Sequence, residues 1–179
     1  MRILVLGGSG FVGRHVCEQL VRAGHKVTVP TRRASRAHPA GGLVAVGTSD
    51  SVLVSNGAEW QPLPTSQPLS LIRAVRFDRA GRLWVGAYNE IGWFENPGRD
   101  NVRFHSLRPH LPADLAPRLK DTWFCSERDG VAWFSTNDAI IRWDGRTARH
   151  WDLPGARRIF GFESLGETWF NHLETGLYR

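Results

Sequence analysis

Three regularly spaced glycines form the stretch of this sequence best suited to chemistry. Gly7, Gly10 and Gly13 follow the apolar run 3–6 and precede a segment with helical periodicity. Gly7 permits a tight turn, Gly10 lets a pyrophosphate approach the backbone, and Gly13 lets the helix pack on the strand. The helix N-terminus supplies free N–H groups to the phosphates. The cofactor-binding residues expected here are Gly7, Gly10, Phe11, Val12 and Gly13.

The elements that must position this turn can be predicted from the neighbouring residues. The apolar run 3–6 is typical of a parallel strand buried on both faces. Apolar residues then recur at three- and four-residue spacing over 10–23, which predicts a helix, and Gly24 suits its C-cap. Residues 26–30 are predicted to form a second strand. The first part of the chain is therefore expected to be a β-α-β unit.

The position after the second predicted strand bears on the choice of cofactor. An acid there would bind the ribose hydroxyls of NAD, but the chain has Arg32 and Arg33. An arginine at this point can accommodate a 2′-phosphate, which favours NADP. The alternative is that these two arginines and Arg36 are solvated loop charges. The two interpretations have equal weight from the sequence.

Residues 1–33 resemble the N-terminus of the extended and atypical short-chain dehydrogenases/reductases, the NAD-dependent epimerase/dehydratase group. Within that group they are most similar to the branch that includes accessory proteins of respiratory complex I. The resemblance implies a Rossmann-like fold with the three glycines at the pyrophosphate and Arg32 near the adenosine ribose. The Tyr-x-x-x-Lys pair of the enzymatic members is missing, because Tyr88 and Tyr178 have no lysine four residues on. We therefore assign no catalytic residue.

Charge and aromatic residues divide the chain into two dissimilar parts. Residues 1–40 contain seven Lys/Arg and one acid, whereas residues 41–179 contain sixteen of each sign and all eight tryptophans. No basic stripe is found, which argues against nucleic-acid binding. Two isolated cysteines, Cys17 and Cys125, indicate neither a disulfide framework nor a zinc site. No segment resembles a signal peptide or a membrane span, so we expect a cytoplasmic protein without membrane insertion.

A second pattern is a repeat that occurs four times after residue 41. The copies start near Gly42, Gly81, Gly130 and Gly166, with a tryptophan or alanine three residues on. The residue five positions on is small or polar, and a second apolar run starts ten positions on. The intervals between copies approach the ~40–50 residues of a propeller blade. The strands that this reading expects lie at 74–77, 83–86, 91–94, 102–105, 122–125, 132–134, 140–143, 149–153, 159–162 and 168–170.

Residues 42–179 resemble the repeats of two-component-regulator β-propellers, and 82–86 match their core motif well. The resemblance implies a ligand-sensing β-propeller and no catalytic residue. About three and a half blades are expected, because residues 34–41 cannot supply an opening strand. Such an incomplete ring would leave open edges that favour self-association.

Few functional roles can be assigned to the tryptophan and histidine side chains of the repeats. Trp84, Trp133 and Trp169 recur in register and are predicted to be blade core. Trp60 and Trp151 lie outside that register and are weak candidates for binding a small molecule or oligosaccharide. The histidines are spread along the chain, so no metal site is predicted.

The sequence as a whole predicts a mostly β protein, a partial β-propeller preceded by a Rossmann-like β-α-β segment. Its expected organisation is a dinucleotide-binding segment at 1–33, a linker at 34–41 and the repeats at 42–179. The first hypothesis is a non-catalytic fusion or chimera that binds or senses a ligand. The second is a degenerate NAD(P)-binding oxidoreductase or epimerase in which residues 43–46 form a third strand of the Rossmann sheet. A protein-interaction scaffold is the third.

Overall fold

The computed structural model of the chain describes residues 2–4, 11–28, 42–55, 59–68, 70–172 and 176–178. The chain divides into two compact units, Met1–Gly42 and Leu43–Arg179. Each unit is considered by itself. The linker expected at 34–41 lies outside the described residues.

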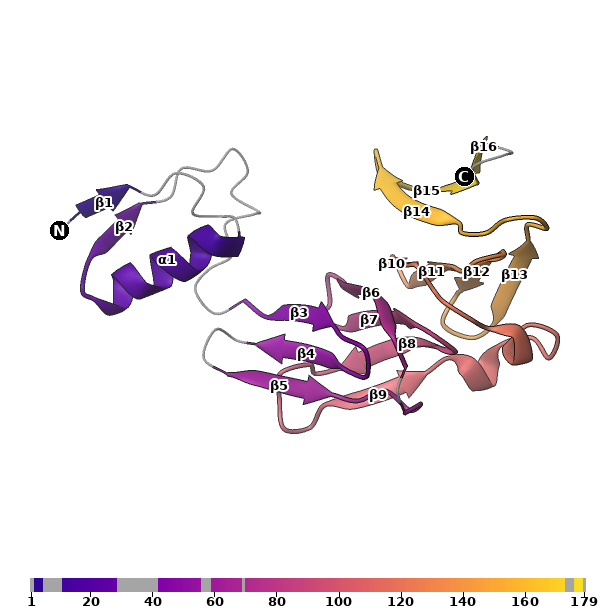
Figure 1. Cartoon of the computed structure of the whole chain (residues 1–179), viewed down its shortest axis with the longest axis horizontal. Coiled ribbons are helices and arrows are strands. Elements are labelled where there is room, and N and C mark those ends of the chain that lie inside the picture. Colours follow the sequence, from indigo (N-terminus) through magenta and orange to yellow (C-terminus); the bar gives the residue numbers. More distant parts are fainter. Residues whose placement is uncertain are drawn as a thin grey trace. The chain divides into compact units, whose positions relative to one another are not determined.

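The first unit has the β-α-β order that the sequence predicts (Figure 1). Strand β1 (Arg2–Leu4) pairs in parallel with β2 (Lys26–Thr28), and helix α1 (Phe11–Arg22) connects them. Gly24 ends the helix with a φ of +80°. Its N–H donates to the Val21 carbonyl and that of His25 to the Leu20 carbonyl, which is a Schellman cap. The predicted helix and its glycine cap are confirmed.

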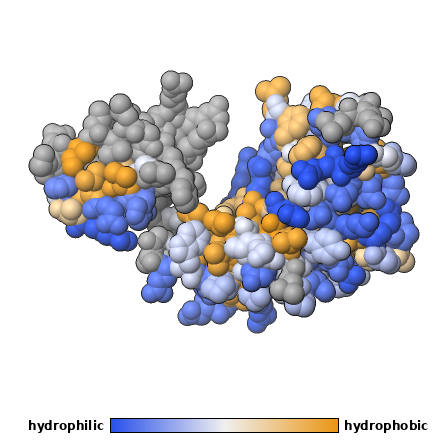
Figure 2. Space-filling view, viewed as in Figure 1, coloured by the Kyte–Doolittle hydropathy of each residue, from blue (hydrophilic) through white to orange (hydrophobic). Residues whose placement is uncertain are grey.

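Helix α1 keeps part of its apolar surface in solvent. Val16 and Val21 are 42% and 57% exposed, while Cys17 and Leu20 are half-buried. The sheet described beside the helix has two strands, too few to cover its apolar face. Apolar residues of this unit are visible on its surface in Figure 2.

The described residues of the second unit form four antiparallel sheets whose strands follow one another in sequence order (Figure 1). The first sheet contains β3 (Val44–Gly47), β4 (Val52–Ser55) and β5 (Trp60–Leu63). The second contains β6 (Ile72–Phe77), β7 (Leu83–Ala87), β8 (Glu90–Glu95) and β9 (Arg103–Ser106). The third contains β10 (Phe124–Arg128), β11 (Val131–Ser135), β12 (Ala139–Trp143) and β13 (Ala148–Asp152). The fourth contains β14 (Phe160–Ser164), β15 (Glu167–His172) and β16 (Gly176–Tyr178).

Two 3-10 turns, η2 (Arg108–His110) and η3 (Ala116–Arg118), lie between the second and third sheets. None of the helices in the part of the chain that the structure describes has the length and apolar character needed to cross a membrane. On the face of the second unit drawn in Figure 2, hydrophilic residues predominate and apolar residues form small patches.

Two expectations about strands are corrected. The proposal that 43–46 extends a parallel Rossmann sheet is wrong, because β3 pairs antiparallel with β4 in a separate sheet. The strand expected at 122–125 instead runs from Phe124 to Arg128. Thr122 is excluded from it because its N–H donates to Ala87 of the preceding sheet.

The small residue of the first three repeats lies against the residue through which the chain enters the next sheet. A Cβ on Gly47 would lie 2.6 Å from Ile72 Cγ2, and one on Gly86 would lie 2.8 Å from the Thr122 carbonyl oxygen. In the third copy, Ser135 donates its hydroxyl to the Ile159 carbonyl at 2.7 Å. Ile72, Thr122 and Ile159 all stand at or just before the first strand of the following sheet. Packing between sheets therefore explains why this position is small.

The same junction is closed by a repeated backbone hydrogen bond. The N–H of Ile72 donates to Thr48, that of Thr122 to Ala87, and that of Ile159 to Thr136. Each acceptor directly follows the small residue of its repeat. The three consecutive sheet-to-sheet junctions therefore share one geometry.

The apolar core lies between successive sheets rather than inside any one of them. One cluster joins the first and second sheets, a second joins the second and third, and a smaller one joins the third and fourth. Trp84, 3% exposed, and the fully buried Phe134 meet in the central cluster, with ring centroids 6.0 Å apart. The core assignment is confirmed for Trp84, whereas Trp133 and Trp169 are only half-buried. Trp133 is on β11 and packs against the smallest of the three clusters, whereas Trp169 is on β15 of the last sheet.

Candidate functional site

The glycine-rich turn of the first unit is only partly described. Gly7, Gly10, Arg32 and Arg33 lie outside the described residues. The backbone of Phe11, Val12 and Gly13 forms the first turn of α1, and Gly13 is half-buried. That first turn contains no acidic residue.

The start of α1 has the properties of an anion-binding position. A helix of twelve residues has four N–H groups without intrahelical partners at its N-terminus and a partial positive charge there. No carboxylate of the first turn competes for these groups. The glycine at its third position keeps side-chain volume low on the helix. This end of the helix therefore suits a phosphate group.

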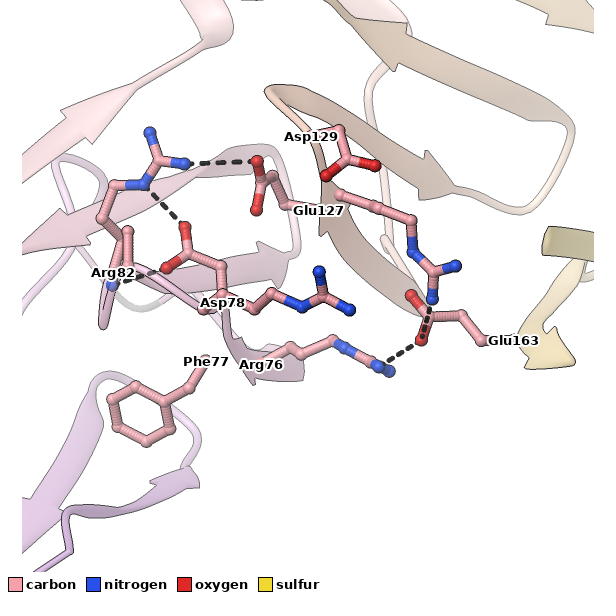
Figure 3. A pocket seen from close by; sticks show the side chains of 10 residues that line it. Arg76, Phe77, Asp78, Arg82, Glu127, Asp129 and Glu163 are labelled. Atoms are coloured by element: carbon pink, nitrogen blue, oxygen red, sulfur yellow. Dashed lines mark hydrogen bonds and ion pairs between the residues drawn. The ribbon is translucent and has the colours of Figure 1, made fainter. Parts of the chain in front are cut away.

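A cluster of charged side chains in the second unit lines a cavity of about 400 Å³ (Figure 3). It lies where the turns after β6 and β10 meet strand β14. Its charged lining residues are Arg76, Asp78, Arg79, Arg82, Glu127, Arg128, Asp129 and Glu163. The four arginines balance the four acids. The lining contains no Ser, Thr, Cys, Tyr, His or Lys side chain that could act as a nucleophile.

Asp78 anchors one side of this charged cavity. Its side chain has no exposed surface and accepts bonds from the Arg82 backbone N–H at 2.9 Å, Arg82 Nε at 2.6 Å and Trp84 Nε1 at 2.9 Å. Burial by itself would raise the pKa of Asp78, but the bonds from Trp84 and Arg82 together outweigh it and lower that pKa. Arg82 also reaches Glu127 Oε1 at 3.3 Å, which links the second sheet to the third.

Glu163 organises the other side of the cavity. It pairs with Arg76 and lies 3.8 Å from Arg128 Nη2, so one carboxylate joins three sheets (Figure 3). Arg128 in addition donates to the Gly166 carbonyl. The cavity therefore offers a ligand both hydrogen-bond donors and acceptors.

The two tryptophans proposed as ligand contacts lie elsewhere. Trp60 is on β5 and Trp151 on β13, 50% and 47% exposed. Trp151 stacks on Trp133 with ring centroids 5.9 Å apart. Neither lines the charged cavity, and they belong to different sheets. Their role in binding stays a prediction.

Cys125 and the histidines have structural surroundings. Burial raises the pKa of the Cys125 thiol to about 12, which keeps it protonated and unreactive. His105 stacks on Trp93, and His150 lies 3.2 Å from Asp114. Within the described residues, no group of three His, Cys, Asp or Glu side chains is arranged to hold a metal ion.

The charged cavity was missed in the sequence because its members lie far apart in the chain. Glu163 is 87 residues from Arg76. The one sequence pattern that could have indicated the cavity is a charged residue close to a turn residue with positive φ. Examples are the turns 78–81 and 127–130. That signal is also typical of ordinary solvated turns.

Comparison with known proteins bears on the N-terminal part. Residues 3–60 match the NAD dependent epimerase/dehydratase family. A stretch of 29 residues is 52% identical to UDP-glucose 4-epimerase of Klebsiella pneumoniae, covering 16% of this chain and 21% of the relative. The chain thus spans about a fifth of the length of that curated relative. The family match includes β3 and β4, which form an antiparallel hairpin here.

Proposed function

We propose that the first unit is a dinucleotide-binding segment that holds the pyrophosphate of NADP at the N-terminus of α1. The single observation that carries this proposal is the family match, which falls on a parallel β-α-β unit with a glycine-rich first turn. The likeness to an epimerase over 29 residues supports it further. The segment is the Rossmann-like part of the chain, and the residues assigned to the cofactor are Gly7, Gly10, Phe11, Val12, Gly13, Arg32 and Arg33.

The described part of the unit fits this cofactor. The first turn of α1 offers N–H groups without a competing carboxylate, as a pyrophosphate requires. Arg32 and Arg33 would accommodate a 2′-phosphate after the second strand. A bound nicotinamide would supply hydride transfer, whereas this chain supplies binding and orientation. We assign no proton relay, because neither tyrosine is followed four residues on by a lysine.

Isothermal titration with NADPH and NADH tests the proposal. A charge-assisted contact contributes about 1.5–3 kcal/mol, so NADPH is expected to bind roughly tenfold to a hundredfold more tightly than NADH. The double variant Arg32→Glu, Arg33→Glu should lose that preference, and Arg36→Glu, a matched control from the adjoining linker, should keep it. Failure of either nucleotide to bind the wild-type chain would contradict the dinucleotide site. Equal binding of both would contradict only the NADP assignment.

A second candidate function belongs to the second unit: a partial β-propeller that binds a polar ligand without catalysis. The observation that favours it is the backbone hydrogen bond repeated at three successive sheet junctions, which suits blades stacked around an axis. The first strand of each sheet also contacts the first strand of the next, from β3 to β6, β10 and β14. The charged cavity lies beside these first strands.

A neutral oligosaccharide is the ligand class that fits this cavity best. Four arginines and four acids provide donors and acceptors but no net charge, as a hydroxyl-rich neutral molecule requires. Titration with maltohexaose and cellohexaose, followed by tryptophan fluorescence, tests this. Arg79→Gln, which changes a lining arginine, should weaken binding, and Arg103→Gln, which changes an exposed arginine on β9, should not. If both variants changed oligosaccharide binding equally, the charged cavity would not be the binding site.

Three further measurements on the same protein distinguish the broader functional hypotheses. Turnover of NADPH with a carbonyl substrate would favour the oxidoreductase or epimerase interpretation over a non-catalytic one. Sedimentation that shows a concentration-dependent dimer would support closure of the sheet array by self-association. A partner lost on deleting 42–179 would favour the protein-interaction scaffold.

A further inference from the structure

A second cavity in the Leu43–Arg179 unit contains an arginine without a partner. It measures about 440 Å³ and lies between the loop before β6, the end of β9 and the two 3-10 turns. This volume is far above the ~30 Å³ of one water and falls within the ~300–1,000 Å³ of small-molecule sites. Arg108, Ser66, Ser106 and Gln67 supply its polar groups.

Arg108 is the unexplained group of this cavity. Its Nε is buried and has no hydrogen-bond partner among the described residues. Within the same residues, its guanidinium also forms no ion pair, unlike that of Arg82 or Arg118. A buried donor left unsatisfied costs about 1–3 kcal/mol, more when it is charged. Such an atom in a native fold calls for an explanation, and because Arg108 as a whole is only half-buried at the edge of the cavity, a bound anion can supply one.

The floor of the cavity limits which anion can bind. Glu90 is completely buried and accepts bonds from Ser66 Oγ, from Ser106 Oγ at 2.7 Å and from the Ile91 N–H at 3.0 Å. Both serine hydroxyl protons are therefore committed to Glu90. Their oxygens can only accept a hydrogen bond from a ligand. Ser106 Oγ already accepts the Arg108 backbone N–H at 3.2 Å, so a ligand hydroxyl would give it a second donor.

The charge balance favours one negative charge over two. Arg108 is the one cation that lines the cavity, and the carboxyl group of Glu90 lies directly behind its serines. A dianion such as phosphate would meet a single guanidinium with an acid close by. A carboxylate carries one charge and matches the planar fork of arginine with two parallel bonds. Pro109, Ala116 and Pro117 add an apolar wall.

We propose that this cavity is a binding site for a small hydroxy-monocarboxylate, with its carboxylate on Arg108 and its hydroxyl on Ser66 or Ser106. The apolar body of the ligand lies against Pro109 and Pro117. Binding would satisfy the buried Nε that the protein alone leaves without a partner. The site is separate from the glycine-rich turn and from the charged cavity, so it stands whether or not the proposed functions hold.

The test is a titration of the full chain with mandelate, which has a carboxylate, a neighbouring hydroxyl and an apolar ring. The Nε–H signal of Arg108 is followed by NMR and assigned through its loss in Arg108→Lys. We expect a saturable shift with a Kd near 1 mM, as for weak small ligands. Mandelamide, which has no charge, should bind at least tenfold more weakly. No shift with mandelate at about 10 mM, or equal binding of mandelamide, would overturn the proposal.

Two matched variants locate the site. Arg108→Gln should weaken mandelate binding at least tenfold, and Arg103→Gln, an exposed arginine five residues earlier, should leave it within twofold. Far-UV circular dichroism checks that both fold. If Arg108→Gln does not fold, the proposal is still tested by comparing how mandelate and mandelamide shift the Arg108 Nε–H signal of the wild-type chain. Tighter binding of inorganic phosphate than of mandelate at Arg108 would contradict the carboxylate assignment.

Discussion

Replacing Asp78 with asparagine tests whether the charged cavity is held together as its geometry indicates. The side chain of Asp78 is fully buried and accepts three bonds, two from Arg82 and one from Trp84 Nε1. Asparagine has almost the same shape, but one of its two terminal atoms is an NH₂ donor. That donor would face either Arg82 Nε and Trp84 Nε1 or the Arg82 backbone N–H. At least one buried bond must be lost.

The size of the effect follows from which bonds are buried. Trp84 is 3% exposed, so an Nε1–H left without its charged acceptor costs about 1.5–3 kcal/mol. The Arg82 side chain is 37% exposed, so its ion pair is screened and contributes only about 0.2–1 kcal/mol. We therefore expect Asp78→Asn to lower the free energy of unfolding by about 2–4 kcal/mol near neutral pH.

The effect should depend on pH in a defined direction. The pKa of Asp78 in the folded state lies below its ordinary value of 3.8. Above that ordinary value both states are ionised and the stabilisation is complete. As the pH falls below it, the unfolded state takes up a proton first, and the stabilisation disappears through the folded-state pKa. The gap between wild type and Asp78→Asn should be widest above about pH 5 and shrink toward pH 2.

Urea unfolding followed by tryptophan fluorescence measures this gap. All eight tryptophans lie after residue 40, so the signal reports the second unit. Asp129→Asn is the matched control, because Asp129 lies in the corresponding turn of the third sheet and asparagine tolerates its φ of +52°. It should change stability by less than about 0.5 kcal/mol. An equally small effect of Asp78→Asn, or a gap that widens in acid, would refute the reasoning.

Three further outcomes are expected from the packing between sheets. Gly86→Ala should lower the free energy of unfolding by about 1–3 kcal/mol, because its Cβ would lie 2.8 Å from the Thr122 carbonyl oxygen. Urea titration measures this change, and an unchanged unfolding midpoint would contradict it. Phe134→Ala should cost about 3–5 kcal/mol in the same assay, since the ring is fully buried against Trp84, and a loss under about 1 kcal/mol would count against the assigned core. Cys125 should not react with Ellman's reagent until urea unfolds the chain, because burial raises its pKa to about 12. If Cys125 in the folded protein reacted as fast as the half-buried Cys17, its thiol would be accessible and the prediction would be wrong.

Local patterns were sufficient to predict most of the individual strands. The repeat of a glycine, an apolar run and a tight turn corresponds to hairpins such as β7–β8, in which Gly86 pairs with Ile91. The helix 11–22 and its cap at Gly24 were equally accessible. Hairpins and capped helices depend on residues within about ten positions of one another, so the sequence carries their signal directly.

The third-strand alternative failed because an apolar run does not specify its pairing partner. Residues 43–46 could join a parallel or an antiparallel sheet by composition alone. Their neighbours decided the outcome, since Thr48 and Asp50 form a tight turn that leads back along β4. The half-burial of Trp133 has a similar origin, because part of the cover over its ring comes from Phe170 of the last sheet.

The sequence by itself determined the β-α-β unit, the four hairpin repeats and the separation of charge between the two parts of the chain. Only the tertiary structure brought Arg76 to Glu163 and left the Nε of Arg108 buried without a partner. The reason is physical: hydrogen bonding within a hairpin and helical periodicity are short-range along the chain. Cavities form where side chains from separate sheets meet, and their composition depends on the packing of those sheets rather than on any spacing in the sequence.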